Sequence, residues 1–173
     1  GEPAVRRQVE LTEVMPDHGD HGAVNGDPHA GHGGSDSHHG THGPGHGATS
    51  HTSDDDKAVR PRVDFLINGR AFAMNDILFE GQVGEIEEWE VFNNSHMDHP
   101  FHVHGTHFQV IATRDADSEW RDVPWLAWKD TVNLAPYQRL RLRMVFPEPG
   151  DWLFHCHIIE HEELGMMATI RVS

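Results

Sequence analysis

The chain has 173 residues, enough for one domain and a tail, and its formal net charge at pH 7 is −15. This acidic balance argues against nucleic acid and against an anionic membrane surface as partners. No apolar run approaches the roughly 20 residues needed to cross a bilayer, and we recognise no secretory signal.

The first 57 residues contain no Phe, Trp or Tyr. Near the start, "RRQVELTEV" alternates apolar and polar residues, so we interpret residues 1–17 as a remnant of a preceding domain, its last strand cut off from its sheet, together with the start of a linker. Residues 18–57 are rich in His and Gly and are expected to form a flexible, disordered linker, because they cannot bury enough apolar surface to offset their ordering entropy. Its imidazoles could collect Cu(II), or the segment could be a hydrophilic spacer.

Residues 58–173 hold every aromatic residue and show strand signals at short intervals. In chain order these are "RVDFLI", "VGEIEEWEVF", "FHVHG", "FQVIATR", "DTVNL", "RLRLRMVF", "DWLFHCH" and "MATIRV", and no long helix is convincing. About eight short strands predict an all-β domain, either a sandwich or a Greek-key barrel.

Two His-x-His pairs lie in these predicted strands, His102 with His104 and His155 with His157. Residues i and i+2 of a strand point to the same face, so each pair presents two imidazoles together, and Cys156 faces the opposite way. Two strands of this kind can build a wall of four imidazoles, which suits a cluster of copper ions.

Cys156 is the only cysteine, so it forms no internal disulfide, and a special role for it is reactive or metal-binding. A thiolate, two imidazoles and a distant thioether make the trigonal ligand set of a blue-copper electron-transfer centre. Cys156, His161 and Met166 supply three of these groups, and His99, at a bend before the other histidine pair, is the candidate for the fourth. His96 and His107 are interpreted as surface or core residues.

"HPFHVHGTHF" (99–108) and "HCHIIEHEELGMM" (155–167) together resemble the C-terminal copper-binding domain of multicopper oxidases of the laccase and copper-efflux type. "FLINGRAFAMND", "GEIEEWEVFN" and "WKDTV" are similar to the connecting strands of that domain. The resemblance covers residues 58–173 and implies a cupredoxin-like fold.

The resemblance also implies a role for each matching position. Glu162 matches a carboxylate that feeds protons to bound oxygen, and Cys156 carries electrons to the oxygen site. The implied copper ligands are His99, Cys156, His161 and, as a weak axial ligand, Met166 for type 1 copper; His104 for type 2 copper; and His102, His155 and His157 for the type 3 pair.

A family member of this kind takes single electrons from a phenol, an aromatic amine or cuprous ion. It passes them through His155-Cys156-His157 to a trinuclear copper cluster, where dioxygen is reduced to water. The cluster uses eight histidines and this chain carries half of them. We therefore expect the rest from missing N-terminal cupredoxin domains of a longer oxidase or from another chain, and expect the isolated chain to be inactive. A periplasmic or extracellular location is implied by the family alone.

Two other functions are compatible with parts of the pattern. The chain could be a stand-alone blue-copper electron-transfer or copper-binding module, or it could resemble a copper-containing nitrite reductase, which also joins type 1 copper to a second copper through a Cys-His pair. Histidines on both sides of Cys156 favour the trinuclear arrangement.

Overall fold

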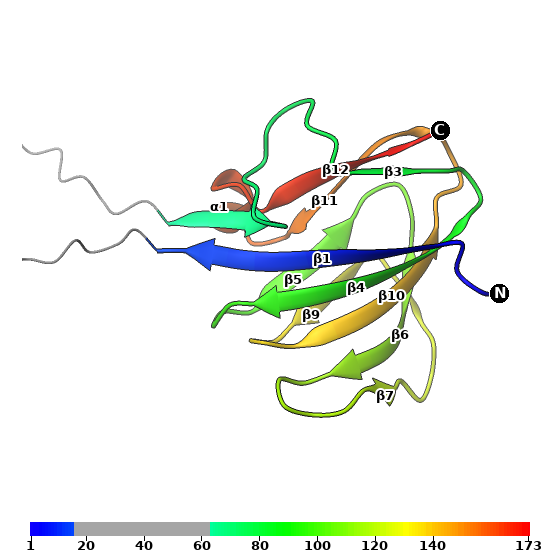
Figure 1. Ribbon diagram of the computed structural model, residues 1–173, viewed down its shortest axis with the longest axis horizontal. Coiled ribbons are helices and arrows are strands. Elements are labelled where there is room, and N and C mark those ends of the chain that lie inside the picture. Colours follow the sequence, from blue (N-terminus) through cyan, green and yellow to red (C-terminus); the bar gives the residue numbers. More distant parts are fainter. Residues whose placement is uncertain (16–62) are drawn as a thin grey trace, which may run out of the picture. The chain divides into compact units, whose positions relative to one another are not determined.

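The computed structural model describes residues 1–15 and 63–173. These residues form two β-sheets and one short helix (Figure 1). The prediction of a flexible linker over residues 18–57 falls outside the described residues. Within the described residues, no helix is long and apolar enough to cross a membrane. The assignment of residues 1–17 to a preceding domain, and the domain boundaries as a whole, stay predictions.

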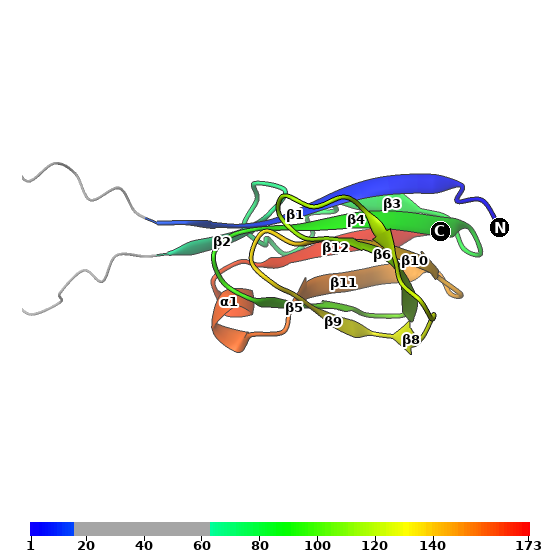
Figure 2. The same ribbon diagram turned by 90° about the horizontal axis from the view of Figure 1, so that it is seen from below.

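The larger sheet has seven strands in the order β2-β1-β4-β10-β6-β7, with β8 also paired to β6. The smaller sheet has five strands in the order β3-β12-β11-β5-β9. In Figure 2, β1 and β4 lie on one side of the domain and β5, β9 and β11 on the other. The elements of the larger sheet are β1 (Val5–Val14), β2 (Asp64–Ile67), β4 (Ile86–Asn94), β6 (Phe108–Arg114), β7 (Arg121–Asp122), β8 (Trp128–Lys129) and β10 (Arg139–Val145). Those of the smaller sheet are β3 (Phe79–Gly81), β5 (His99–Val103), β9 (Thr131–Leu134), β11 (Gly150–Cys156) and β12 (Met167–Val172), and the helix α1 is Ile159–Glu163.

The all-β prediction is confirmed, with two differences in detail. The described part of the chain has twelve strands where the sequence suggested about eight, because pairings as short as β7 and β8 leave no alternating pattern to detect. The five-residue helix α1 is likewise too short to show a helical period. The alternation in β10 is confirmed, since Leu140, Leu142 and Met144 are buried.

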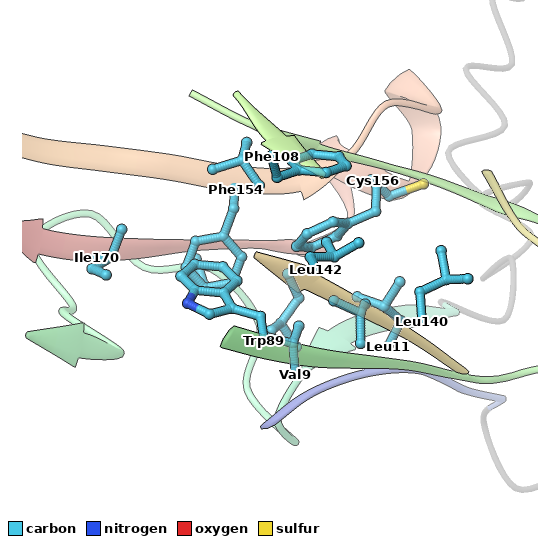
Figure 3. Close-up of a cluster of buried hydrophobic side chains, with 14 of the residues drawn as sticks. Val9, Leu11, Trp89, Phe108, Leu140, Leu142, Phe154, Cys156 and Ile170 are labelled. Atoms are coloured by element: carbon cyan, nitrogen blue, oxygen red, sulfur yellow. The ribbon is translucent and has the colours of Figure 1, made fainter. Parts of the chain in front are cut away.

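The core lies between the sheets and is built around aromatic rings in contact with one another. Trp89 is fully buried, and its ring meets that of Phe154 edge to face with a centroid separation of 4.9 Å. Such pairs add about 0.5–1.5 kcal/mol to the stabilisation from area burial. Figure 3 shows Cys156 on the opposite side of this cluster from Ile170, next to Phe108. The core therefore supports the cysteine from one side.

The predicted strand near the start of the chain is confirmed as β1, but the expectation that its sheet is missing is wrong. β1 pairs in parallel with β4, where Val9 lies opposite Val91, and antiparallel with β2, where Leu11 lies opposite Ile67. All four side chains are buried in the core. Burial of these apolar residues gives β1 a place within this sheet.

A buried ion pair attaches β1 to both sheets. Arg7 donates from Nε and Nη2 to the Glu87 carboxylate at 2.7 and 2.8 Å, and Glu87 is only 1% exposed. The same guanidinium donates to the backbone oxygen of Glu80 in β3 and lies 4.8 Å above the Phe79 ring. Trp89 donates from its indole nitrogen to the same carboxylate. Arg7 therefore joins a strand of the larger sheet to a strand of the smaller one.

We expect Arg7→Met to lower the free energy of unfolding by about 3–5 kcal/mol, because the variant leaves the Glu87 charge buried and unpaired. Arg6→Met is the matched control. Arg6 is the neighbouring arginine, is largely exposed and pairs with Glu88 at 3.4 Å, so its loss should cost about 0–1 kcal/mol. Urea unfolding followed by tryptophan fluorescence measures both values. Equal losses in the two variants would contradict a special contribution of Arg7.

Candidate metal centre

The site is organised by the pairing of β5 with β11. These strands are antiparallel, and their register sets His102 opposite His155 and Phe101 opposite Cys156. Directly opposite residues point to the same face of a sheet, and the next residue along points to the other. The histidines therefore gather on one side of β11, and Cys156 lies on the side of the core. This is the arrangement that the His-Cys-His pattern predicted.

On the core side, His99, Cys156 and His161 form a buried group, which we call the sulfur site. Cys156 Sγ lies 3.5 Å from His99 Nδ1 and 3.6 Å from His161 Nδ1, and the two Nδ1 atoms are 3.2 Å apart. One sulfur and two nitrogens thus converge on a common point. This donor set and its burial fit a copper ion of the blue type.

A chain of hydrogen bonds fixes which nitrogen of His99 faces the sulfur site. Its Nε2 is 2.8 Å from Ser95 Oγ, and Ser95 in turn donates to Asn93 Oδ1 at 2.9 Å. Asn93 is itself held, since its Nδ2 donates to the backbone oxygens of Met97, Leu134 and Ala135. With Nε2 donating to Ser95, the lone pair of Nδ1 is left for a metal.

Ser95 and Asn93 were missed from the sequence. Asn93 follows Trp89 and Val91 on the buried face of β4. A polar residue at an inward position must find a hydrogen-bond partner, and this pattern could have indicated a structural role for Asn93. The contact of Ser95 with His99, four residues later, has no signal in the sequence, because it depends on how the chain turns into β5.

The turn after β11 brings the remaining residues of this site together. The Cys156 N–H donates to the Met166 oxygen at 3.1 Å, and the Met166 N–H donates to the His161 oxygen at 2.9 Å. These two bonds close the loop that contains α1. The His161 ring stacks on Phe65 of β2 with a centroid separation of 4.0 Å. The Met166 side chain is fully buried, and its axial role stays a prediction.

Burial sets the protonation state of the sulfur site. It raises the pKa of the Cys156 thiol to about 11 and lowers the pKa of His99 to about 4. Burial also lowers the pKa of His161. The metal-free site therefore holds a thiol and neutral imidazoles at neutral pH, and a metal that binds the thiolate releases a proton.

On the other side of β11, four histidines form what we call the imidazole wall: His102, His104, His155 and His157. The ring of His102 lies 4.8–5.4 Å from the rings of the other three. His104 Nε2 is 2.9 Å from His155 Nε2. Ligand atoms of His102, His104 and His155 lie within 4.8 Å of one another, whereas His157 joins this wall through ring contacts alone.

Two of the wall histidines, His102 and His155, are oriented through their Nδ1 atoms. His102 Nδ1 is 2.9 Å from both the Asp130 backbone oxygen and Thr131 Oγ1, and His155 Nδ1 is 2.9 Å from the Cys156 oxygen. Their Nε2 atoms are therefore on the metal-facing side, where that of His155 lies against His104 Nε2, and this is the reverse of the choice at His99. Asp130 and Thr131 were also missed as orienting residues, although "WKDTV" was recognised as a family segment.

Glu162 lies beside the imidazole wall, whereas His96 and His107 lie outside both groups of ligands. Glu162 Oε2 lies 3.4 Å from His155 Nδ1, at the end of the wall nearest α1. Its proton role stays a prediction. His96 and His107 are exposed and belong to neither group, as expected.

A family model described as multicopper oxidase matches residues 44–173. The chain belongs to the multicopper oxidase family. It is 40% identical over 111 residues to a multicopper oxidase of Staphylococcus aureus, a match that covers 62% of this chain and 24% of the relative. A laccase of Haloferax volcanii is 36% identical over 112 residues, 64% of this chain and 19% of that one. The chain thus spans about a quarter, or less, of these relatives.

A solved structure gives the same result in three dimensions. A multicopper oxidase from Campylobacter jejuni, described as a metallo-oxidase, superposes with a TM-score of 0.70 and 31% identity. The match covers 99% of this chain and 30% of that structure. The cupredoxin-like fold expected from the two histidine motifs is therefore confirmed.

We expect Ser95→Ala to weaken copper retention at the sulfur site about 10- to 100-fold, the usual effect of removing a group that orients a ligand. The measurement is loss of the blue absorption band against increasing chelator. Ser118→Ala is the control, because Ser118 lies in an exposed turn. Unchanged retention in Ser95→Ala would show that packing alone orients His99.

We expect the metal-free protein to lose stability as the pH falls from about 6.5 to about 4. The pKa of His99 is about 4 when folded and near the ordinary value when unfolded, so the unfolded chain binds the proton more readily in this window. The contribution of neutral His99 to the free energy of unfolding is complete above about pH 6.5 and is lost by about pH 4. Urea unfolding at a series of pH values measures it, and His99→Asn should flatten the dependence. An equally steep curve in the variant would assign the loss to other groups.

Proposed function

We propose that this chain is the copper-binding, electron-accepting domain of a multicopper oxidase that reduces dioxygen. The observation that carries the proposal is the position of Cys156. Its sulfur belongs to the sulfur site, while its backbone is bonded directly to His155 and His157 of the imidazole wall. One residue thus connects the two groups of ligands by covalent bonds.

The proposed ligand sets follow the two groups. Copper, when bound, supplies one-electron chemistry at the sulfur site and oxygen reduction at the wall. The proposed sets are His99, Cys156, His161 and axial Met166 for type 1 copper; His104 for type 2 copper; and His102, His155 and His157 for the type 3 pair. In this scheme the protein holds His99, His102 and His155 by one ring nitrogen each, which preorganises these ligands.

Glu162 is proposed to hold a proton for the oxygen site. Its carboxylate is two-thirds buried and lies within 3.4 Å of His155 Nδ1. A carboxylate at this distance can take up a proton from solvent and hold it beside the wall.

The wall is proposed to be half of a larger site. His104 and His157 are exposed, and a cavity of about 550 Å³ adjoins the wall, lined by residues that include His107 and Asp130. Trp128, which also lines this cavity, is largely exposed. This open surface supports a partner here, either a missing cupredoxin domain of the same protein or another chain that completes the cluster.

The reducing substrate is proposed to be a phenol, an aromatic amine or cuprous ion. One relative is named a laccase, which fits an organic donor, and one solved structure is described as a metallo-oxidase, which fits a metal ion. A periplasmic or secreted location is proposed on the family alone. The histidines of residues 18–51, which lie outside the described residues, are proposed either to collect Cu(II) or to act as a spacer.

The alternative is a stand-alone blue-copper electron carrier. The imidazole wall argues against it, because an electron carrier needs ligands on the sulfur side only. A nitrite-reductase-like arrangement needs fewer histidines around the cysteine than the four in the wall.

The test is copper binding by the chain and by Cys156→Ser. We expect an intense blue band from the chain loaded with copper, and its complete loss in the variant, because the band arises from the bond between copper and thiolate sulfur. In the complete oxidase the same variant should abolish oxygen consumption. His107→Gln, at an exposed histidine outside both groups, is the control and should keep the colour. A blue Cys156→Ser protein would sink the proposal.

A further inference from the structure

A carboxylate occupies an inward position at the end of β1. Val9 and Leu11 point into the core, and the next residue on that face is Glu13, whose side chain is only 8% exposed. Burying a carboxylate is expensive, and an apolar side chain would suit the position better. A charged residue at an inward-facing strand position breaks the usual apolar pattern, and such exceptions point to a functional reason.

Glu13 lies next to the sulfur site. Its partner in the β1–β2 register is Phe65, which stacks on the ring of His161. Directly opposite residues share a face, so the Glu13 carboxylate and the Phe65 ring point the same way. Burial lowers the pKa of His161, and the charge of Glu13 opposes that shift, as expected for groups close enough to interact.

The charge of Glu13 is incompletely compensated. One oxygen, Oε1, pairs with His96 Nδ1, on the segment that leads to His99. The other, Oε2, is buried and accepts no hydrogen bond from the residues that the structure describes. The negative charge therefore acts on its surroundings at low dielectric, where it is strong.

We propose that Glu13 lowers the reduction potential of the copper held by His99, Cys156 and His161. The inference rests on the proposed function of that site. When one electron from the donor converts Cu(II) to Cu(I), the ion loses one positive charge, and a nearby negative charge stabilises the oxidised form more. Glu13 is thus a residue that tunes the site through space, without binding the metal.

This role limits which donors the site accepts. A lower potential at the electron-accepting copper demands a stronger reducing agent. It also increases the driving force for passing the electron on through Cys156. Glu13 would therefore adjust the balance between substrate range and onward transfer.

The test is a redox titration of the blue band in Glu13→Gln, carried out at pH 8, where ordinary histidines are neutral. The amide keeps the shape and a hydrogen-bond acceptor but removes the charge. At a fixed solution potential the ratio of reduced to oxidised copper should rise roughly tenfold, the effect of one charge near 10 Å at an effective dielectric of about 20. Copper content and band position should stay as in the wild type.

Two controls separate charge from structure. Glu10→Gln removes a carboxylate from the outer face of the same strand, where it accepts a hydrogen bond from Asn94, and should leave the titration unchanged. Glu13→Asp keeps the charge and should also titrate near the wild type. Glu13→Met serves if the glutamine variant folds poorly, since an apolar side chain suits the inward position.

The outcomes are distinct. A blue Glu13→Gln or Glu13→Met protein that titrates like the wild type overturns the inference. A shift of equal size in Glu13→Asp also overturns it, because geometry and not charge would then be responsible. A wild-type protein with copper but no blue band would instead refute the proposed function of the sulfur site itself.

Discussion

The alternation of side chains along β11 is the constraint on which the site depends. A single residue step moves a side chain from one face of a strand to the other, so Cys156 and His155 meet different neighbours although one peptide bond joins them. The register with β5 must hold for the same reason. A slip of one residue would turn His102 toward the core and Phe101 toward the imidazole wall. Both sheets, and the aromatic core between them, stabilise that register.

The second requirement is the orientation of the imidazoles, and three of them are hydrogen-bonded to neutral groups. A hydroxyl orients His99, and backbone oxygens orient His102 and His155. The choice of nitrogen differs between the two sites, because the polar partners lie on different sides of the rings. None of these partners carries a charge that would need compensation in the metal-free protein, which suits a site that is formed before metal arrives.

The sequence predicted the parts of the site that follow from short-range geometry. The two His-x-His pairs and the cysteine between histidines determine their own faces within a strand, and the return of His161 to Cys156 needs only a short loop. Ser95, Asn93 and Glu13 could not be found in this way, because their contacts depend on how distant segments pack. The sheet partner of β1 was missed for a related reason. Its parallel neighbour β4 is more than seventy residues away in the sequence, and the alternation in "RRQVELTEV" indicates a strand without indicating its neighbours.

The pairing of β1 with β2 has a consequence for how this domain can change in evolution. Val14 and Asp64 lie opposite each other in the register, so the chain leaves the sheet and returns to it at adjacent points. The ends of whatever lies between are already together, and lengthening a closed loop twofold costs only about 0.6 kcal/mol. Insertions, deletions or new binding sequences between these two strands therefore leave the copper ligands in place, and this domain can acquire new chemistry there at little cost to its fold.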